Sequence, residues 1–168
     1  MNEIEQCIME IKIYGFTILD GVVSTEVANQ MRESLILCEQ KVGTEHTHRG
    51  SASHVSNLPT LDPIFHQCID HPRTLPILEH FLDKSMILGS LNSRIVRPGD
   101  DYQKLHSDIP ATMLNMESPV MMNTVWLLDD FSPAIGGTRV VPGSHHSGLI
   151  EPPPDFDVKH IVQPSAPA

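Results

Sequence analysis

The sequence predicts an α+β, mainly β domain in which helices come first and strands come later. In the first part, about residues 1–84, apolar residues recur at helical spacing. From about residue 85 to residue 168, short segments rich in β-branched and apolar residues are separated by Pro and Gly. This order favours an antiparallel sandwich or barrel as the second part. The length of 168 residues suits one domain, 1–168, with a sizeable core.

The first part begins with a predicted helix from about Glu3 to Ile13, because isoleucines recur there at helical spacing. The segment GFTILDGVV (residues 15–23) then predicts a strand. Ser24 caps a second helix, which Gly43 ends. The apolar stripe of this helix comprises Val27, Met31, Leu35, Cys38 and Val42.

A polar, turn-rich stretch from Thr44 to Asn57 follows and predicts an irregular segment near the mouth of a site. His46, His48 and His54 lie in it, and their spacing matches no zinc pattern, so we interpret them as solvated loop histidines. Two short helices are predicted next, near Pro63–Ile69 and Arg73–Leu82, since proline is tolerated in a first helical turn.

The second part contains three strand-like segments: MILGSLNSRIV (86–96), NTVWLLDDF (123–131) and TRVVPGS (138–144). Turns between them are indicated by RPGDD (97–101) and AIGG (134–137). His145 and His146 follow the Pro-Gly turn, and turn or surface hydrogen bonding explains them better than metal binding does.

Charge and composition exclude several function classes. The formal net charge of −10 argues against binding to nucleic acids or anionic membranes, which requires basic patches. No apolar run approaches the roughly 18–20 residues of a membrane span, and the N-terminus lacks the pattern of a secretory signal. Cys7, Cys38 and Cys68 are widely spaced, which predicts reduced thiols in a cytoplasmic protein.

The strongest chemical signal is His106-Ser107-Asp108 in KLHSDIP (104–110). On an extended segment, residues i and i+2 point to the same side, so one imidazole and one carboxylate can bind a metal ion from one face. These two side chains are two thirds of the 2-His-1-carboxylate triad of non-haem iron(II) enzymes. H-x-D alone is a common pattern, but its position after a strand and a Pro-Gly turn favours a site.

Trp126 lies in a strand-like run, and Thr124 shares its face by the two-residue period. A core tryptophan is the first interpretation for a lone aromatic residue in a strand. A functional role for Trp126 is indicated only when the surrounding segments are compared with a known family.

Three segments, GFTILDGVVS (15–24), RPGDDYQKLHSDIP (97–110) and VWLLDDFSPAIGGTRVVPGSHHSG (125–148), together resemble the phytanoyl-CoA dioxygenase family of iron(II)- and 2-oxoglutarate-dependent oxygenases. The resemblance covers roughly Tyr14 to Gly148. It implies a double-stranded β-helix (a cupin-like jelly roll) with flanking N-terminal helices. It also implies that a small molecule is hydroxylated with O2, while 2-oxoglutarate is converted to succinate and CO2.

The resemblance assigns roles to individual residues. His106 and Asp108 match the first two iron ligands, and retention of the acid favours oxygenation over halogenation. Trp126, with Thr124 on its face, matches an aromatic residue beside the 2-oxoglutarate pocket. Ser107 flanks the ligands, and Ser93 is a weaker match for a residue near 2-oxoglutarate.

Two elements of the family pattern are missing: a second iron-binding histidine on a later strand and an arginine soon after it that binds the far carboxylate of 2-oxoglutarate. The last arginine is Arg139, and His160, preceded by Lys159, is the remaining candidate for the third ligand. We therefore expect the chain to end before the closing strands of the jelly roll, with exposed sheet edges and little turnover.

Two alternatives remain open. One is a truncated or degenerate, non-catalytic relative that acts as a binding or assembly module. The other is a cupin-like metal protein, although cupins gather histidines around a closely spaced H-x-H set that this chain lacks.

Overall fold

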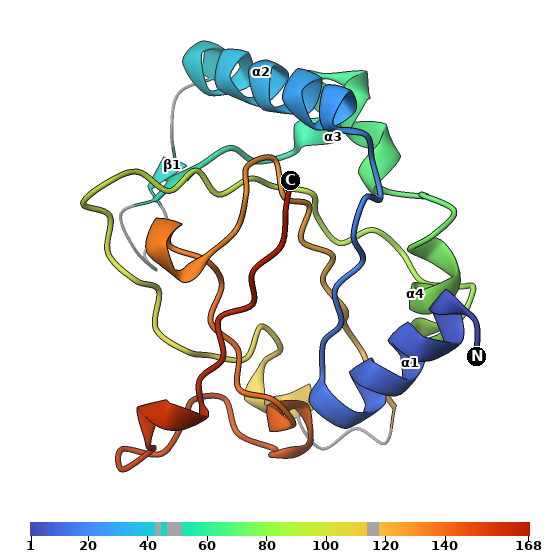
Figure 1. The fold of residues 1–168 in the computed structure, drawn as a ribbon, viewed down its shortest axis with the longest axis vertical. Coiled ribbons are helices and arrows are strands. Elements are labelled where there is room, and N and C mark those ends of the chain that lie inside the picture. The colour runs from blue at the N-terminus through green and yellow to red at the C-terminus, as the bar shows by residue number, and fades with distance from the viewer. Residues whose placement is uncertain (43–44, 47–51, 114–117) are drawn as a thin grey trace.

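The computed structural model describes residues 1–42, 45–46, 52–113 and 118–168 (Figure 1). Helices dominate the first part, and the second part consists mainly of long irregular segments. In the described ranges, no helix is both long and apolar enough to cross a bilayer. The elements are α1 (Glu3–Tyr14), α2 (Thr25–Val42), β1 (Glu45–His46), β2 (Ser53–His54), α3 (Leu58–Leu61), α4 (Leu75–Leu82) and the 3-10 turns η1 (Pro63–Cys68), η2 (Ala111–Met113), η3 (Pro133–Ile135), η4 (Ser144–His146) and η5 (Val158–His160).

Helix α1 forms where the isoleucine spacing predicts it, and both of its ends are capped. The Asn2 side chain accepts a hydrogen bond from the Glu5 N–H at 2.9 Å, and the Glu5 carboxylate accepts one from the Asn2 N–H at 3.0 Å. At the other end, Gly15 has a left-handed backbone (φ 86°) and donates to the Ile11 carbonyl at 2.8 Å. The helix packs against α4 and buries Cys7.

Helix α2 carries the main apolar core. The Ser24 hydroxyl accepts a hydrogen bond from the Val27 N–H at 3.2 Å, which confirms the predicted cap. The predicted stripe is buried at Met31, Leu35 and Cys38. Gly43, the predicted end of this helix, lies outside the described residues. The core cluster consists of Met31, Leu35, Cys38, Val55, Leu58, Phe65 and Cys68, and Trp126 and Leu128 pack against it from the second part.

The short helices differ in detail from the expectation. The segment predicted near Pro63–Ile69 is the 3-10 turn η1, and the helix predicted from Arg73 begins at Leu75. The one-turn helix α3 was not predicted. Asp62 joins this region to α2, since its carboxylate accepts hydrogen bonds from the Ser34 hydroxyl at 2.6 Å and the Ile64 N–H at 2.9 Å. These bonds, the one from Ser34 first, lower the pKa of Asp62.

A buried carboxylate connects α2 to the second part of the chain. Glu39 is 8% exposed and accepts a hydrogen bond from the Ser53 hydroxyl at 2.6 Å. Arg97 donates to both of its carboxylate oxygens at 2.8 and 2.7 Å. Arg97 in turn begins a tight turn, in which its N–H donates to the Asp100 carboxylate at 2.7 Å. The turn that leads toward His106 is therefore held against the helical core.

The predicted strands do not form ladders in the described part of the chain. GFTILDGVV carries no strand there, and the later segments carry only isolated antiparallel bridges: Ser53–Ile95, Phe131–Ala166 and Val140–Val162. A strand requires successive backbone pairs in register, and each of these contacts supplies a single residue pair. The jelly roll accordingly stays a prediction. Where an irregular segment was predicted, β1 and β2 pair antiparallel, and His48 lies outside the described residues.

We expect Gly15→Ala to destabilise the protein more than Gly99→Ala does. Both glycines have similar left-handed backbones (φ 86° and 94°), but a Cβ at Gly15 would lie 2.5 Å from His145 Nδ1, whereas one at Gly99 would meet nothing within 4 Å. Strain should lower the free energy of unfolding by about 1 kcal/mol in each variant, and the clash by about 2 kcal/mol more in Gly15→Ala. Urea unfolding measures both, and equal losses would contradict the close packing of η4 on α1.

We expect Glu39→Gln to lower the free energy of unfolding by about 2 kcal/mol at pH 7, because it weakens the charge-assisted bond to Arg97. The hydrogen bond from Arg97, then that from Ser53, holds the pKa of Glu39 below its ordinary 4.5. A lowered folded-state pKa means that this stabilisation is present above pH 4.5 and is lost as the pH falls through the folded-state value. The difference from the parent should therefore shrink in acid.

Urea unfolding at pH 7 and at pH 3 tests this expectation. Glu33→Gln, on the exposed face of the same helix, is the matched control and should change stability by less than about 0.5 kcal/mol. A Glu39→Gln difference that is equally large at both pH values would contradict the electrostatic role.

Candidate metal centre

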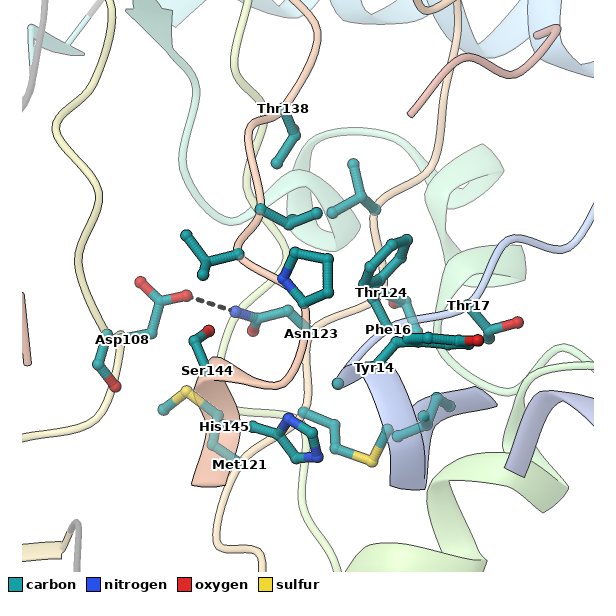
Figure 2. A pocket seen from close by; sticks show the side chains of 18 of the residues that line it. Tyr14, Phe16, Thr17, Asp108, Met121, Asn123, Thr124, Thr138, Ser144 and His145 are labelled. Atoms are coloured by element: carbon teal, nitrogen blue, oxygen red, sulfur yellow. Dashed lines mark hydrogen bonds between the residues drawn. The ribbon is translucent and has the colours of Figure 1, made fainter. Parts of the chain in front are cut away.

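The site lies in a cavity of about 1310 Å³ between the N-terminal segment, α4 and the irregular second part. Figure 2 shows side chains from several of these segments pointing into one space. Most of the wall is apolar, with Val, Ile, Met, Phe and Pro side chains around a few polar groups. The main contributing stretches are residues 14–19, 105–109, 118–127 and 138–153.

His106 and Asp108 meet at the edge of this cavity. His106 Nε2 lies 3.2 Å from Asp108 Oδ1, and the two side chains are 24% and 48% exposed. The adjacency expected from the i, i+2 spacing is thus observed, although no strand is assigned there. The residue between them is fixed, because the Ser107 N–H donates to the Ile150 carbonyl at 2.6 Å. The backbone of Ser107 thus joins the His106–Asp108 segment to the chain at Ile150, and a role of Ser107 beside the cofactor stays a prediction.

The hydrogen bonds of His106 determine which ring nitrogen can bind a metal. Nδ1 lies 2.6 Å from the Lys104 carbonyl oxygen, which can only accept, so Nδ1 carries the proton. Nε2 is then the nitrogen with the lone pair, and the Gln103 side-chain amide, which can only donate, lies 3.3 Å from it. In a metal-binding histidine, the ring nitrogen that does not bind the metal usually donates to a protein acceptor, as Nδ1 does here to the Lys104 carbonyl.

The separation of the two ligand atoms fits one metal ion. With metal–ligand bonds of about 2.1 Å, two adjacent ligands of an octahedron lie ~3 Å apart. The distance of 3.2 Å between His106 Nε2 and Asp108 Oδ1 matches this geometry. A position beside a carboxylate oxygen and an imidazole nitrogen is also electrostatically favourable for a cation. The donor set of imidazole and carboxylate suits iron(II).

Asn123 belongs to the site but was not identified from the sequence. Its side-chain amide donates to Asp108 Oδ2 at 2.7 Å, as the dashed line in Figure 2 shows. The two residues are 15 positions apart and come from different walls of the cavity. A polar residue at the start of the apolar run NTVWLL was the only signal in the sequence, and it does not specify a partner.

Trp126 and Thr124 lie on the side of the cavity that faces the helical core. The indole Nε1–H donates to the Thr124 hydroxyl at 3.2 Å, in agreement with their predicted common face. The indole packs edge-on against the His71 ring, with centroids 5.7 Å apart, and against the core cluster. The structure thus gives Trp126 the packing role of a core tryptophan on the cavity wall. A role beside 2-oxoglutarate stays a prediction.

Two further residues lie away from the His106–Asp108 pair. The Ser93 hydroxyl is buried and accepts a hydrogen bond from the Val55 N–H at 3.2 Å, outside the cavity wall. His160 ends the exposed turn η5, where its ring lies 6.0 Å from that of Phe156. Across the described ranges, no group of three or more His, Cys, Asp or Glu side chains is placed to hold one metal ion.

His145 and His146 form part of the contact between η4 and α1. Their rings lie 3.8 Å apart, and His146 Nε2 is 3.2 Å from the Lys12 carbonyl oxygen. Burial, and then the neighbouring His146, lower the pKa of His145. These contacts agree with the turn role expected from the sequence. The interpretation of His54 as a solvated histidine is wrong for its Nδ1, which is buried and has no hydrogen-bond partner among the described residues.

We expect Trp126→Ala to lower the free energy of unfolding by about 2 kcal/mol, because the half-buried indole packs against the core cluster. Trp126→Phe keeps the ring contact with His71 and should lose less than about 1 kcal/mol. Since Trp126 is the single tryptophan, unfolding is followed by circular dichroism. Equal losses in the two variants would contradict a packing role of the ring.

Comparison with known proteins finds one matching family model and a curated relative. The family model described as phytanoyl-CoA dioxygenase (PhyH) matches residues 11–163. A curated relative named Dioxygenase af480, from Aspergillus fumigatus, is 28% identical over 102 residues, which cover 58% of this chain and 32% of the relative. The matched part therefore spans about a third of that relative's length. No solved structure matches the chain.

Proposed function

This chain belongs to the phytanoyl-CoA dioxygenase family, and on that basis we propose that it is an iron(II)- and 2-oxoglutarate-dependent oxygenase of a small molecule. One observation carries the proposal beyond family membership. His106 Nε2 and Asp108 Oδ1 lie 3.2 Å apart at the edge of a large cavity, at the separation of two adjacent ligands of one metal ion.

In this proposal, His106 and Asp108 hold the metal through Nε2 and Oδ1. When bound, iron(II) and 2-oxoglutarate supply the oxygen activation that leads to hydroxylation. The Lys104 carbonyl keeps the proton of His106 on Nδ1, so that Nε2 stays available as a ligand. Asp108 lines the cavity and is 48% exposed, so a co-substrate in the cavity can reach the metal position beside it.

The cavity wall indicates the class of substrate. Its lining is largely aliphatic, aromatic and proline side chains, which exclude water and favour an apolar or amphipathic small molecule. We propose that the reacting carbon of such a molecule is held against this wall, beside the His106–Asp108 pair. The family's double-stranded β-helix is proposed as the scaffold, with the Phe131–Ala166 and Val140–Val162 bridges as its first antiparallel pairs.

A second candidate, a non-catalytic binding module, is favoured by one specific observation. In the described residues, no third ligand joins the His106–Asp108 pair. Lys159, the basic residue beside His160, is paired with Asp157 at 2.6 Å. Two protein ligands hold iron weakly, so we expect weak metal binding and little turnover by the 168-residue chain.

Anaerobic titration with iron(II) and 2-oxoglutarate tests the proposal. The visible charge-transfer band of the ternary complex should develop in the parent, at high iron concentration, and should be lost in His106→Ala and Asp108→Ala. The matched control Asp155→Ala removes an exposed acid outside the cavity wall and should leave the band unchanged. His160→Ala should also keep the band, because η5 lies outside that wall. A parent without the band would favour the binding module.

A further inference from the structure

We propose that Asn123 is a positioning residue, which holds Asp108 in the orientation that presents one oxygen to the metal. The inference rests on the proposed function, because it concerns the same metal centre. It assigns a role to a side chain that lies outside the H-x-D motif.

The two oxygens of Asp108 have different partners. Oδ1 faces His106 Nε2 at 3.2 Å, and Oδ2 accepts the hydrogen bond from Asn123 Nδ2 at 2.7 Å (Figure 2). The torsion that turns a carboxylate about its Cβ–Cγ bond is soft. A donor fixed on Oδ2 therefore selects one rotation, in which Oδ1 points at the metal position and Oδ2 is withdrawn from it.

The chemistry of the Asn123 side chain suits this role. An amide N–H that donates to a carboxylate forms a charge-assisted bond, which is stronger than one between neutral groups. The amide carries no net charge, so it orients Asp108 without the repulsion that a Lys or Arg side chain would exert on a bound cation. Asp108 is 48% exposed, and a donor fixed to the protein orients its carboxylate more firmly than an exchanging water molecule does.

Asn123 is itself held in place by the core. It directly precedes Thr124, whose hydroxyl accepts the hydrogen bond from the Trp126 indole. The indole packs against the helical core cluster, so the segment that carries Asn123 is anchored two residues further on. The hydrogen bond between Asn123 and Asp108 thereby connects the metal-binding segment to the helical part of the molecule.

Cobalt(II) titration under anaerobic conditions tests the inference with the 168-residue chain. Asn123→Ala and the similarly sized Asn123→Leu should each weaken cobalt binding by about tenfold, as is typical of losing a partner of a ligand. The visible d–d spectrum should also change, because a released Asp108 can bind through both oxygens. Since Asn123 is exposed, the midpoint of thermal unfolding should stay unchanged in both variants.

Asn92→Ala is the matched control. It removes another exposed amide, whose oxygen accepts a hydrogen bond from the Asn57 N–H at 3.0 Å in the helical part, and it should leave cobalt binding unchanged. Asp108→Ala should bind more weakly than either Asn123 variant.

The outcomes separate the inference from the proposed function. If Asp108→Ala weakens cobalt binding while both Asn123 variants match the parent in affinity and spectrum, Asn123 has no positioning role and the metal centre remains. If the parent binds no cobalt, or Asp108→Ala binds as the parent does, the metal centre and the role of Asn123 are both overturned.

Discussion

The arrangement of the site depends on a carboxylate buried on the inner face of α2. Glu39 lies where the helix faces the second part of the chain. Hydrogen bonds from the Ser53 hydroxyl and from Arg97 compensate there for the cost of burying its charge. A buried carboxylate without such partners would be strongly destabilising, so this position selects an arginine from a distant segment. Arg97 begins the turn that leads to His106. This ion pair therefore connects the helical core to the segment that carries His106.

From that turn onward, backbone contacts determine how the ligands are presented. The Ser107 N–H is bound to the Ile150 carbonyl, and His106 Nδ1 is bound to the carbonyl of Lys104. The first contact fixes the segment against the opposite wall of the cavity, and the second fixes the ring and its tautomer. His106 and Asp108 consequently meet without a regular strand, because the i, i+2 relation needs only a locally extended chain.

Features that depend on contacts between residues close in sequence could be predicted, and features that depend on distant contacts could not. The helix α1, the Ser24 cap of α2, the stripe of Met31 and Leu35 and the adjacency of His106 and Asp108 are local, and the structure contains them. The strand in GFTILDGVV was predicted from composition, but strands require a partner in register, which composition does not supply. Asn123 and Gln103 were missed for the same reason, since their roles exist only through contacts with Asp108 and His106 in space.

The contact between His106 Nε2 and Asp108 Oδ1 also bears on stability. At 3.2 Å an imidazole nitrogen and a carboxylate oxygen attract each other when a proton or a cation lies between them, and in the proposed function that cation is the metal ion. Binding to the folded chain alone stabilises it by mass action. In the described residues, the later segments pair through single antiparallel bridges, and hydrogen bonds such as that from the Ser107 N–H to the Ile150 carbonyl join them elsewhere. A cation bound by His106 and Asp108 would add a further connection to this part of the fold.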